Sequence, residues 1–149
     1  MQSMSSHRQG FKRVLIAVDG SEVSLRAVEH ASRIAKQDGA QLVALHVVAA
    51  PPFETVGELG EYYNIARKEA KKWMKEAEGM AEAQGLTLRS EVIVGAYSVV
   101  DAIIGYAESN SVDLIVSGTK GRTPSARTLL GSVASGLVEY AGCAVLVIR

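Results

Sequence analysis

The sequence VLIAVDGS, residues 14–21, joins a continuous apolar run to a polar turn. An apolar run that does not alternate with polar residues suits a strand buried on both faces, as in a parallel sheet. Four further runs of this kind follow along the chain. They span residues 42–48, 92–94, 114–116 and 144–148.

Between these runs, apolar residues recur at the three- and four-residue spacing of amphipathic helices. The stripes predict helices around residues 27–35, 66–80, 99–107 and 133–141. Because strands alternate with helices, right-handed crossovers predict an α/β fold, an open, doubly wound parallel sheet with helices on both faces. Long irregular connections remain at residues 49–60 and 119–130, and such loops in a compact domain are usually functional.

Composition indicates one domain, since 149 residues with 48% hydrophobic content can fill one substantial core. We expect residues 11–149 to form it and residues 1–10 to be a mobile tail. Sixteen basic and sixteen acidic residues cancel, so nucleic acid is not an expected partner. The sequence shows no secretion signal and no apolar run of membrane-spanning length, and it has a single cysteine, Cys143. We therefore expect a cytoplasmic protein that does not bind membranes.

A glycine-rich segment follows the fourth predicted strand. Gly118-Thr119-Lys120-Gly121 is separated by nine residues from Gly131-Ser132, where the last helix begins. Glycine lets backbone N–H groups approach a ligand, and a helix N-terminus adds unpaired donors and a positive dipole end. The segment therefore predicts a phosphate-binding loop. Alternatively, the glycines only turn the chain and Ser132 is an ordinary N-cap.

Asp19 follows the first predicted strand, and Ser21 is placed to cap the next helix. Ligands of open α/β sheets bind beyond the carboxyl ends of strands, where strand order reverses. If the first and fourth strands are neighbours, Asp19 and Gly118 face one crevice. The carboxylate then accepts hydrogen bonds from a ribose or base, or alternatively bonds N–H groups of its own turn. Lys120 and Arg122 either offset phosphate charge or are simply solvated.

Several common motifs are absent. The sequence has no Gly-x-x-x-x-Gly-Lys-Ser/Thr loop, no Gly-x-Gly-x-x-Gly turn after the first strand and no Gly-x-Ser-x-Gly nucleophile elbow. Its histidines, His7, His30 and His46, lack metal-ligand spacing, and His46 in an apolar strand fits a hydrogen-bonded structural role. No catalytic residue and no protein metal site are predicted.

The motifs at residues 18–21, 45–47 and 118–132 together resemble the ATP-binding branch of the universal stress protein family, over residues 11–149. The resemblance implies the adenine nucleotide alpha hydrolase-like fold, a five-stranded parallel sheet in the order 3-2-1-4-5. It implies ATP bound between the first and fourth strands. Mg²⁺ on the phosphates, with Asp19 nearby, belongs to the alternative of slow ATP hydrolysis. The implied ATP-binding residues are Ala17, Val18, Asp19, Val47, Ser117, Gly118, Lys120, Gly121, Arg122, Gly131, Ser132 and Val133.

Family members are commonly homodimers joined through the last strand. Residues 144–148 fit this expectation, because an apolar strand at an uncovered sheet edge invites pairing. The leading hypothesis is a nucleotide-dependent stress-response or regulatory module that is not an enzyme, or at most hydrolyses ATP weakly. The alternatives are a slow Mg²⁺-dependent ATPase and an interaction module that needs no ligand.

Overall fold

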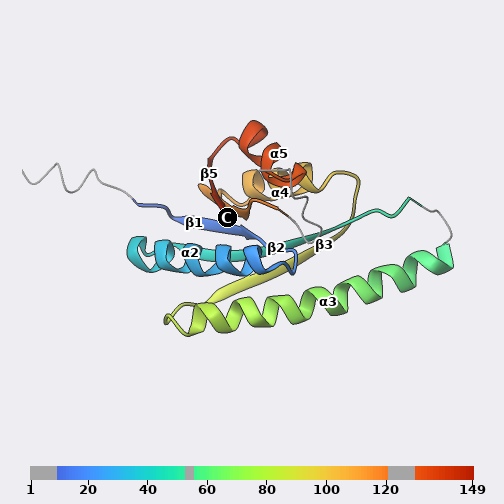
Figure 1. Ribbon diagram of the computed structural model, residues 1–149, viewed down its shortest axis with the longest axis horizontal. Helices are drawn as coiled ribbons and strands as arrows, with labels where there is room; N and C mark the ends of the chain where they lie inside the picture. Colours follow the sequence, from blue (N-terminus) through green and yellow to red (C-terminus); the bar gives the residue numbers. More distant parts are fainter. Residues whose placement is uncertain (1–9, 53–55, 121–129) are drawn as a thin grey trace, which may run out of the picture.

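The computed structural model describes residues 10–52, 56–120 and 130–149. Strands and helices alternate along this part of the chain (Figure 1). The strands are β1 (Arg13–Ala17), β2 (Gln41–Ala49), β3 (Leu88–Ala96), β4 (Leu114–Gly118) and β5 (Ala144–Ile148). The helices are α2 (Glu22–Asp38), α3 (Val56–Glu82), α4 (Val99–Ser109) and α5 (Ser132–Tyr140).

The five strands form one parallel sheet in the order β3-β2-β1-β4-β5, which confirms the expected order 3-2-1-4-5. Strand β1 lies at the centre, and its Ile16 pairs with Ala44 of β2 and Val116 of β4. Both neighbours of β1 follow it in sequence but lie on opposite sides. Strand order therefore reverses at β1, where ligands of such sheets bind.

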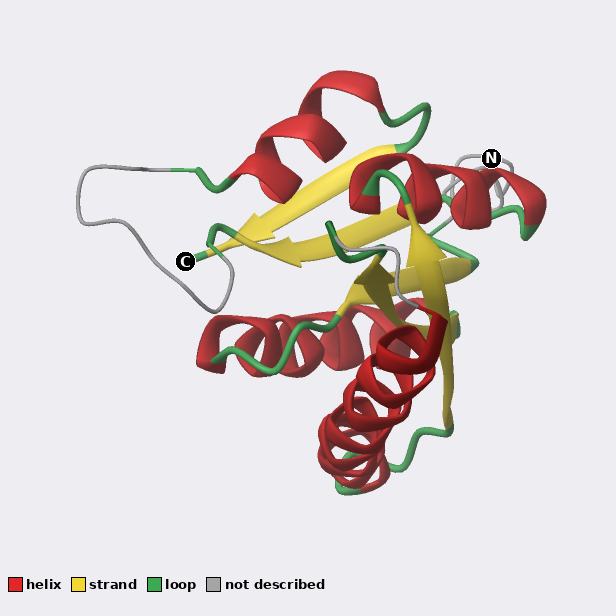
Figure 2. Ribbon diagram, turned by 90° about the vertical axis from the view of Figure 1, so that its right-hand side faces the viewer, coloured by secondary structure: helices red, strands yellow, loops and turns green. Residues whose placement is uncertain are grey.

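Helices cover both faces of the sheet, as predicted. One core cluster joins Val14 and Ile16 of β1 to α2 and α3, and the other joins Leu15 to α4 and α5. Alternate residues of one strand thus enter opposite cores, which is why residues 14–17 of β1 are all apolar. Figure 2 shows the two helical layers on either side of the strands. No helix in the described ranges is long and apolar enough to cross a membrane.

Two predicted boundaries were wrong. Strand β3 extends over Leu88–Ala96 rather than residues 92–94. Its polar residues escaped detection because β3 is an edge strand with only partial burial. Helix α3 begins at Val56, inside the irregular connection expected at residues 49–60. The predicted stripe began later because no side chain between Glu58 and Glu69 is buried. The tail predicted at residues 1–10 lies outside the described residues except for Gly10.

Candidate functional site

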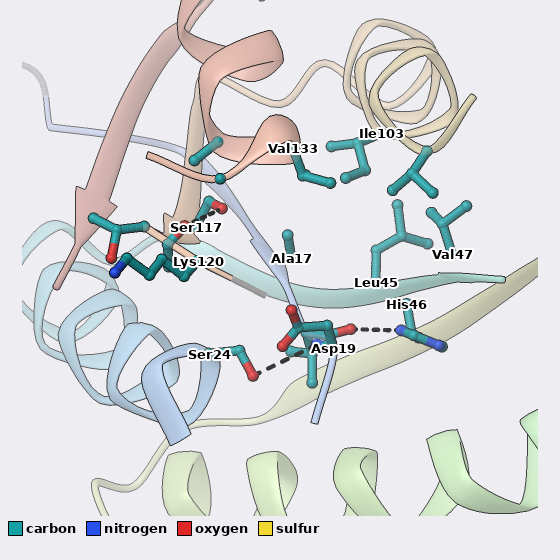
Figure 3. Close-up of a pocket in the computed structure, with 16 residues that line it drawn as sticks. Ala17, Asp19, Ser24, Leu45, His46, Val47, Ile103, Ser117, Lys120 and Val133 are labelled. Carbon is teal, nitrogen blue, oxygen red and sulfur yellow. Dashed lines mark hydrogen bonds between the residues drawn. The ribbon is translucent and has the colours of Figure 1, made fainter. Parts of the chain in front are cut away.

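A pocket lies at the carboxyl ends of β1, β2 and β4 (Figure 3). Because β1 and β4 are paired, Asp19 and Gly118 line this one pocket, as the sequence predicted for neighbouring strands. The volume that the described residues enclose is about 80 Å³. Sites for small organic ligands usually measure roughly 300–1,000 Å³. The described walls therefore enclose less space than a complete site of that kind.

Asp19 orders the turn between β1 and α2. Its Oδ1 accepts hydrogen bonds from the Ser21 N–H, at 3.0 Å, and from the Ser21 hydroxyl. Ser21 is the N-cap of α2, as predicted, and its Oγ accepts from the Ser24 N–H at 3.1 Å. The turn-bonding role considered for Asp19 is thus confirmed. Among the described residues, Oδ2 of Asp19 has no hydrogen-bond partner, so one oxygen orients the carboxylate while the other can meet a ligand.

His46 holds the end of β1 in place. Its Nδ1 lies 2.7 Å from the carbonyl oxygen of Val18. A carbonyl only accepts hydrogen bonds, so Nδ1 carries the proton in this contact. The ring meets Trp73 edge to face, with centroids 5.0 Å apart. The predicted structural role of His46 is confirmed, and the same side chain also lines the pocket.

The end of β4 forms the opposite wall, and Ser117, Gly118 and Thr119 are buried there. The Ser117 hydroxyl donates to the Gly118 carbonyl oxygen at 3.0 Å. The Thr119 N–H donates to the carbonyl oxygen of Ile148 in β5 at 2.7 Å, and the Gly131 N–H donates to the Thr119 carbonyl oxygen. The predicted donor at Gly131 is therefore occupied within the protein.

The packing of helix α2 requires glycine at position 118, whether or not a ligand binds there. A Cβ at this position would lie 2.2 Å from Cγ1 and 3.3 Å from Cβ of Val23, in the first turn of α2. The first distance is far below van der Waals contact, and the second is short of it by a few tenths of an ångström. The absence of a side chain at Gly118 is thus what lets α2 approach the end of β4.

Helix α5 directs its N-terminus toward the pocket. Gly131 is its N-cap and makes no side-chain cap, so the alternative that Ser132 is the N-cap was wrong; Ser132 is the first helical residue. The first N–H groups of a helix have no partner within it, and they carry the positive end of the dipole. Val133 and Ala134 from this turn line the pocket, and Lys120 lines it from the end of β4.

The remaining wall is apolar. Figure 3 shows Leu45, Val47, Ile103 and Val133 gathered on one side of the pocket, with Ser117 and Lys120 on another and Ala17 between them. Leu45 and Ile103 are fully buried, so these side chains form a fixed surface. An apolar surface beside an electropositive helix end suits a ligand with a flat apolar part and a negative part.

The structure brings together nine of the twelve predicted site residues. The pocket is lined by Ala17, Val18, Asp19, Val47, Ser117, Gly118, Lys120, Gly131 and Val133. Ser132 starts α5 without lining the pocket, and Gly121 and Arg122 lie outside the described residues. Sequence reasoning missed Ser24, Leu45, His46, Val99, Ile103, Thr119 and Ala134 as lining residues. Two of these could have been predicted from the sequence. Val99 and Ile103 lie four residues apart on the apolar stripe of α4, and the start of this helix faces the carboxyl ends of the strands.

Metal ligation finds no support in the described ranges, which contain no group of three His, Cys, Asp or Glu side chains placed to hold an ion.

Comparison with known proteins gives one consistent family. The model of the family described as "Universal stress protein family" matches residues 10–149. The universal stress protein MJ0531 of Methanocaldococcus jannaschii is 37% identical over 142 residues, which cover 93% of this chain and 82% of that protein.

Solved structures of such proteins share the fold. The universal stress protein UspA from Lactobacillus plantarum superposes with a TM-score of 0.87 at 29% identity, covering 95% of this chain and 100% of that one. A universal stress protein in complex with cAMP superposes with a TM-score of 0.67 at 30% identity, covering 95% of this chain and 98% of that one.

Proposed function

The chain belongs to the universal stress protein family, and we propose that its pocket binds an adenine nucleotide, ATP, as a regulatory ligand. The observation that carries the proposal is the pocket itself, at the point where strand order reverses, with an apolar wall beside the N-terminus of α5. A related protein binds cAMP, which supports an adenine ligand of this chemical class.

The pocket residues divide between the two parts of a nucleotide. The adenine would lie against Leu45, Val47 and Ile103, and Asp19 would accept a hydrogen bond from the ribose or base through Oδ2. The phosphates would lie toward Lys120 and the first turn of α5, where charge and unpaired N–H groups favour an anion. Mg²⁺, where present, would be held by the phosphates. In this proposal the nucleotide is bound without a dedicated catalytic group.

One residue connects the nucleotide pocket to the edge of the sheet. Thr119 lines the pocket, and its N–H is bonded to Ile148 of β5. Strand β5 is an edge strand, and we propose that two copies pair through it, as the family resemblance implies. A ligand that moves Thr119 would therefore move the edge on which that dimer depends. The nucleotide would act on a stress response by changing this surface, in the cytoplasm.

The first test identifies the ligand. Protein purified in low salt is denatured, and the supernatant is examined by chromatography and mass spectrometry for adenine nucleotides. The ligand-free protein is then titrated with ATP while its melting temperature is followed. Ligand at a hundred times its dissociation constant adds about 2.7 kcal/mol, and a domain of this size gains roughly 2–4 °C per kcal/mol. We expect a rise of about 5–11 °C; no nucleotide and no rise would refute the proposal.

The second test places the phosphates. Val133→Asp puts a carboxylate in the first turn of α5 inside the pocket, where it repels phosphate. Val138→Asp makes the same change on the exposed face of α5, where the side chain is 54% exposed. We expect Val133→Asp to weaken ATP at least tenfold and adenosine much less, and Val138→Asp to weaken neither. Equal losses for ATP and adenosine would show that the phosphates lie elsewhere.

A further inference from the structure

The first half of α3 contacts the rest of the domain on one side, where the Tyr62 hydroxyl donates to the Ala49 carbonyl oxygen at 3.4 Å. Its buried side chains, Ala70, Met74, Ala77 and Ala81, all belong to the second half. Figure 1 shows the beginning of α3 extending beyond the N-terminal end of α2. The helix has 27 residues, so it is about 40 Å long and only part of it is needed to cover the sheet. The side of the first half of α3 that faces away from the sheet therefore has no partner in the described part of the chain.

This face carries an ordered stripe of five exposed residues. Glu58, Glu61, Ile65, Lys68 and Lys72 follow one another at spacings of three and four residues. That spacing keeps them on one side of a helix. Two acids precede the apolar residue and two bases follow it. Ile65, the apolar residue at the centre of the row, is 53% exposed and also borders a pocket with Tyr62 and Trp73.

Within one chain the charges of this stripe repel each other. Glu58 and Glu61 are three residues apart, and Lys68 and Lys72 are four apart, so each has a like charge as its helical neighbour. Across the described part of the chain, the ion pairs join Arg33 to Glu29 and Arg89 to Glu91, and none involves the stripe. Lys72 also has the acids Glu69 and Glu76 at such spacings, whereas Glu58, Glu61 and Lys68 have only like-charged or uncharged neighbours three and four residues away within α3. The acidic end of the stripe and Lys68 thus lack an opposite charge along the helix.

We propose that α3 pairs with α3 of a second copy of this chain, antiparallel, about a two-fold axis at Ile65. The axis reverses the helix direction, so Glu58 meets Lys72 of the partner subunit and Glu61 meets Lys68 of the partner subunit. The two Ile65 side chains pack together at the centre. A parallel arrangement would instead place acid against acid and base against base. Only the antiparallel pairing neutralises the charges, and it is the self-complementary contact that a two-fold axis requires.

The contact is separate from the dimer edge proposed for β5. Strand β5 forms one edge of the sheet, and β3, against which α3 packs, forms the other. Both contacts can therefore exist in one assembly, in which α3 pairing would join β5 dimers to one another. The inference does not depend on nucleotide binding.

Charge reversal tests the pairing. Glu61→Lys and Lys68→Glu each bring like charges together across the axis, and each is expected to weaken the association step at least tenfold in sedimentation velocity. Within the helix, Glu61→Lys removes the repulsion with Glu58, and Lys68→Glu removes the repulsion with Lys72. Neither change should therefore destabilise the folded monomer. An equimolar mixture of the two variants places two lysines opposite two glutamates. The mixture is expected to associate as the unaltered chain does, and more strongly than either variant alone.

Matched controls separate position from net charge. Glu82→Lys, at the far end of α3, and Lys36→Glu, on α2, are exposed and change the charge by the same amounts. They should leave the association step unchanged, and added salt should weaken that step in the unaltered chain. The proposal is overturned if Glu61→Lys sediments like the unaltered chain up to millimolar concentration, or if mixing the two reversed variants fails to restore association.

Discussion

Replacing Gly118 with alanine is expected to destabilise the ligand-free domain by about 2 kcal/mol, because overpacking a tight contact typically costs 1–3 kcal/mol. The added Cβ would lie 2.2 Å from Cγ1 of Val23. Rotation of Val23 can move that methyl group but not its Cβ, at 3.3 Å, or its backbone carbonyl carbon, at 3.4 Å. Helix α2 itself must then shift slightly, so rotation alone does not relieve the conflict.

A second substitution tests the cause. Val23 is half-buried, so Val23→Ala alone should cost about 1 kcal/mol through lost apolar burial. In the double variant the methyl groups that meet the new Cβ are gone. Its cost should therefore fall at least about 1 kcal/mol short of the sum of the single costs, a coupling of the size expected for residues in contact.

Urea unfolding followed by fluorescence of Trp73, the only tryptophan, measures all four proteins, and an unchanged denaturant slope verifies that the unfolding reaction is the same. If Gly118 is glycine only to admit phosphate, Gly118→Ala would leave ligand-free stability unaltered and lower only nucleotide affinity. A change of less than about 0.5 kcal/mol without ligand, or additive costs in the double variant, refutes the helix-packing account.

Three further outcomes are expected. Ser21→Ala removes the N-cap of α2 and the donor to Asp19, and should lower the free energy of unfolding by about 1 kcal/mol in the same urea assay, whereas Ser21→Asn should retain most of it. Burial and the Glu91 carboxylate raise the pKa of Tyr106 to about 12. The folded state therefore holds a proton that the unfolded state loses near pH 10, so stability should decline as pH rises from about 10 to 12, and Tyr106→Phe should reduce that decline in pH-dependent urea unfolding. Burial, followed by the charge of Asp113, raises the pKa of the Cys143 thiol. The thiol should therefore react with a disulfide reagent at pH 8 more slowly in the folded protein than in the urea-unfolded chain. Equal rates would contradict the raised pKa.

The sheet was predictable because its central strands are buried on both faces. Residues 14–18 and 114–116 carry no alternation, and that pattern is typical of interior parallel strands. Strand β3 shows the limit of this signal. It is an edge strand in which Arg89 is exposed and Val92 is only partly covered, so local composition did not show where it starts.

The candidate site was predictable where it follows directly from strand ends. Asp19 and Gly118 come immediately after buried strands, and parallel strands bring their carboxyl ends to one edge. Val99 and Ile103 were missed because α4 enters the site from a distant part of the chain. The hydrogen bond from the Gly131 N–H to the Thr119 carbonyl oxygen joins residues that are far apart in sequence, so no local pattern indicates it.

The sequence by itself determined the alternation of strands and helices, the N-cap at Ser21, and the position of polar residues after β1 and β4. These features depend on neighbours a few residues away. Only the tertiary structure decided why residue 118 is glycine. The sequence suggested that glycine leaves space for a ligand. In the structure, the space that a Cβ of residue 118 would occupy is filled by Val23, ninety-five positions earlier in the chain. That distance is closed by the packing of α2 on β4, a contact between surfaces that no local spacing of residues encodes.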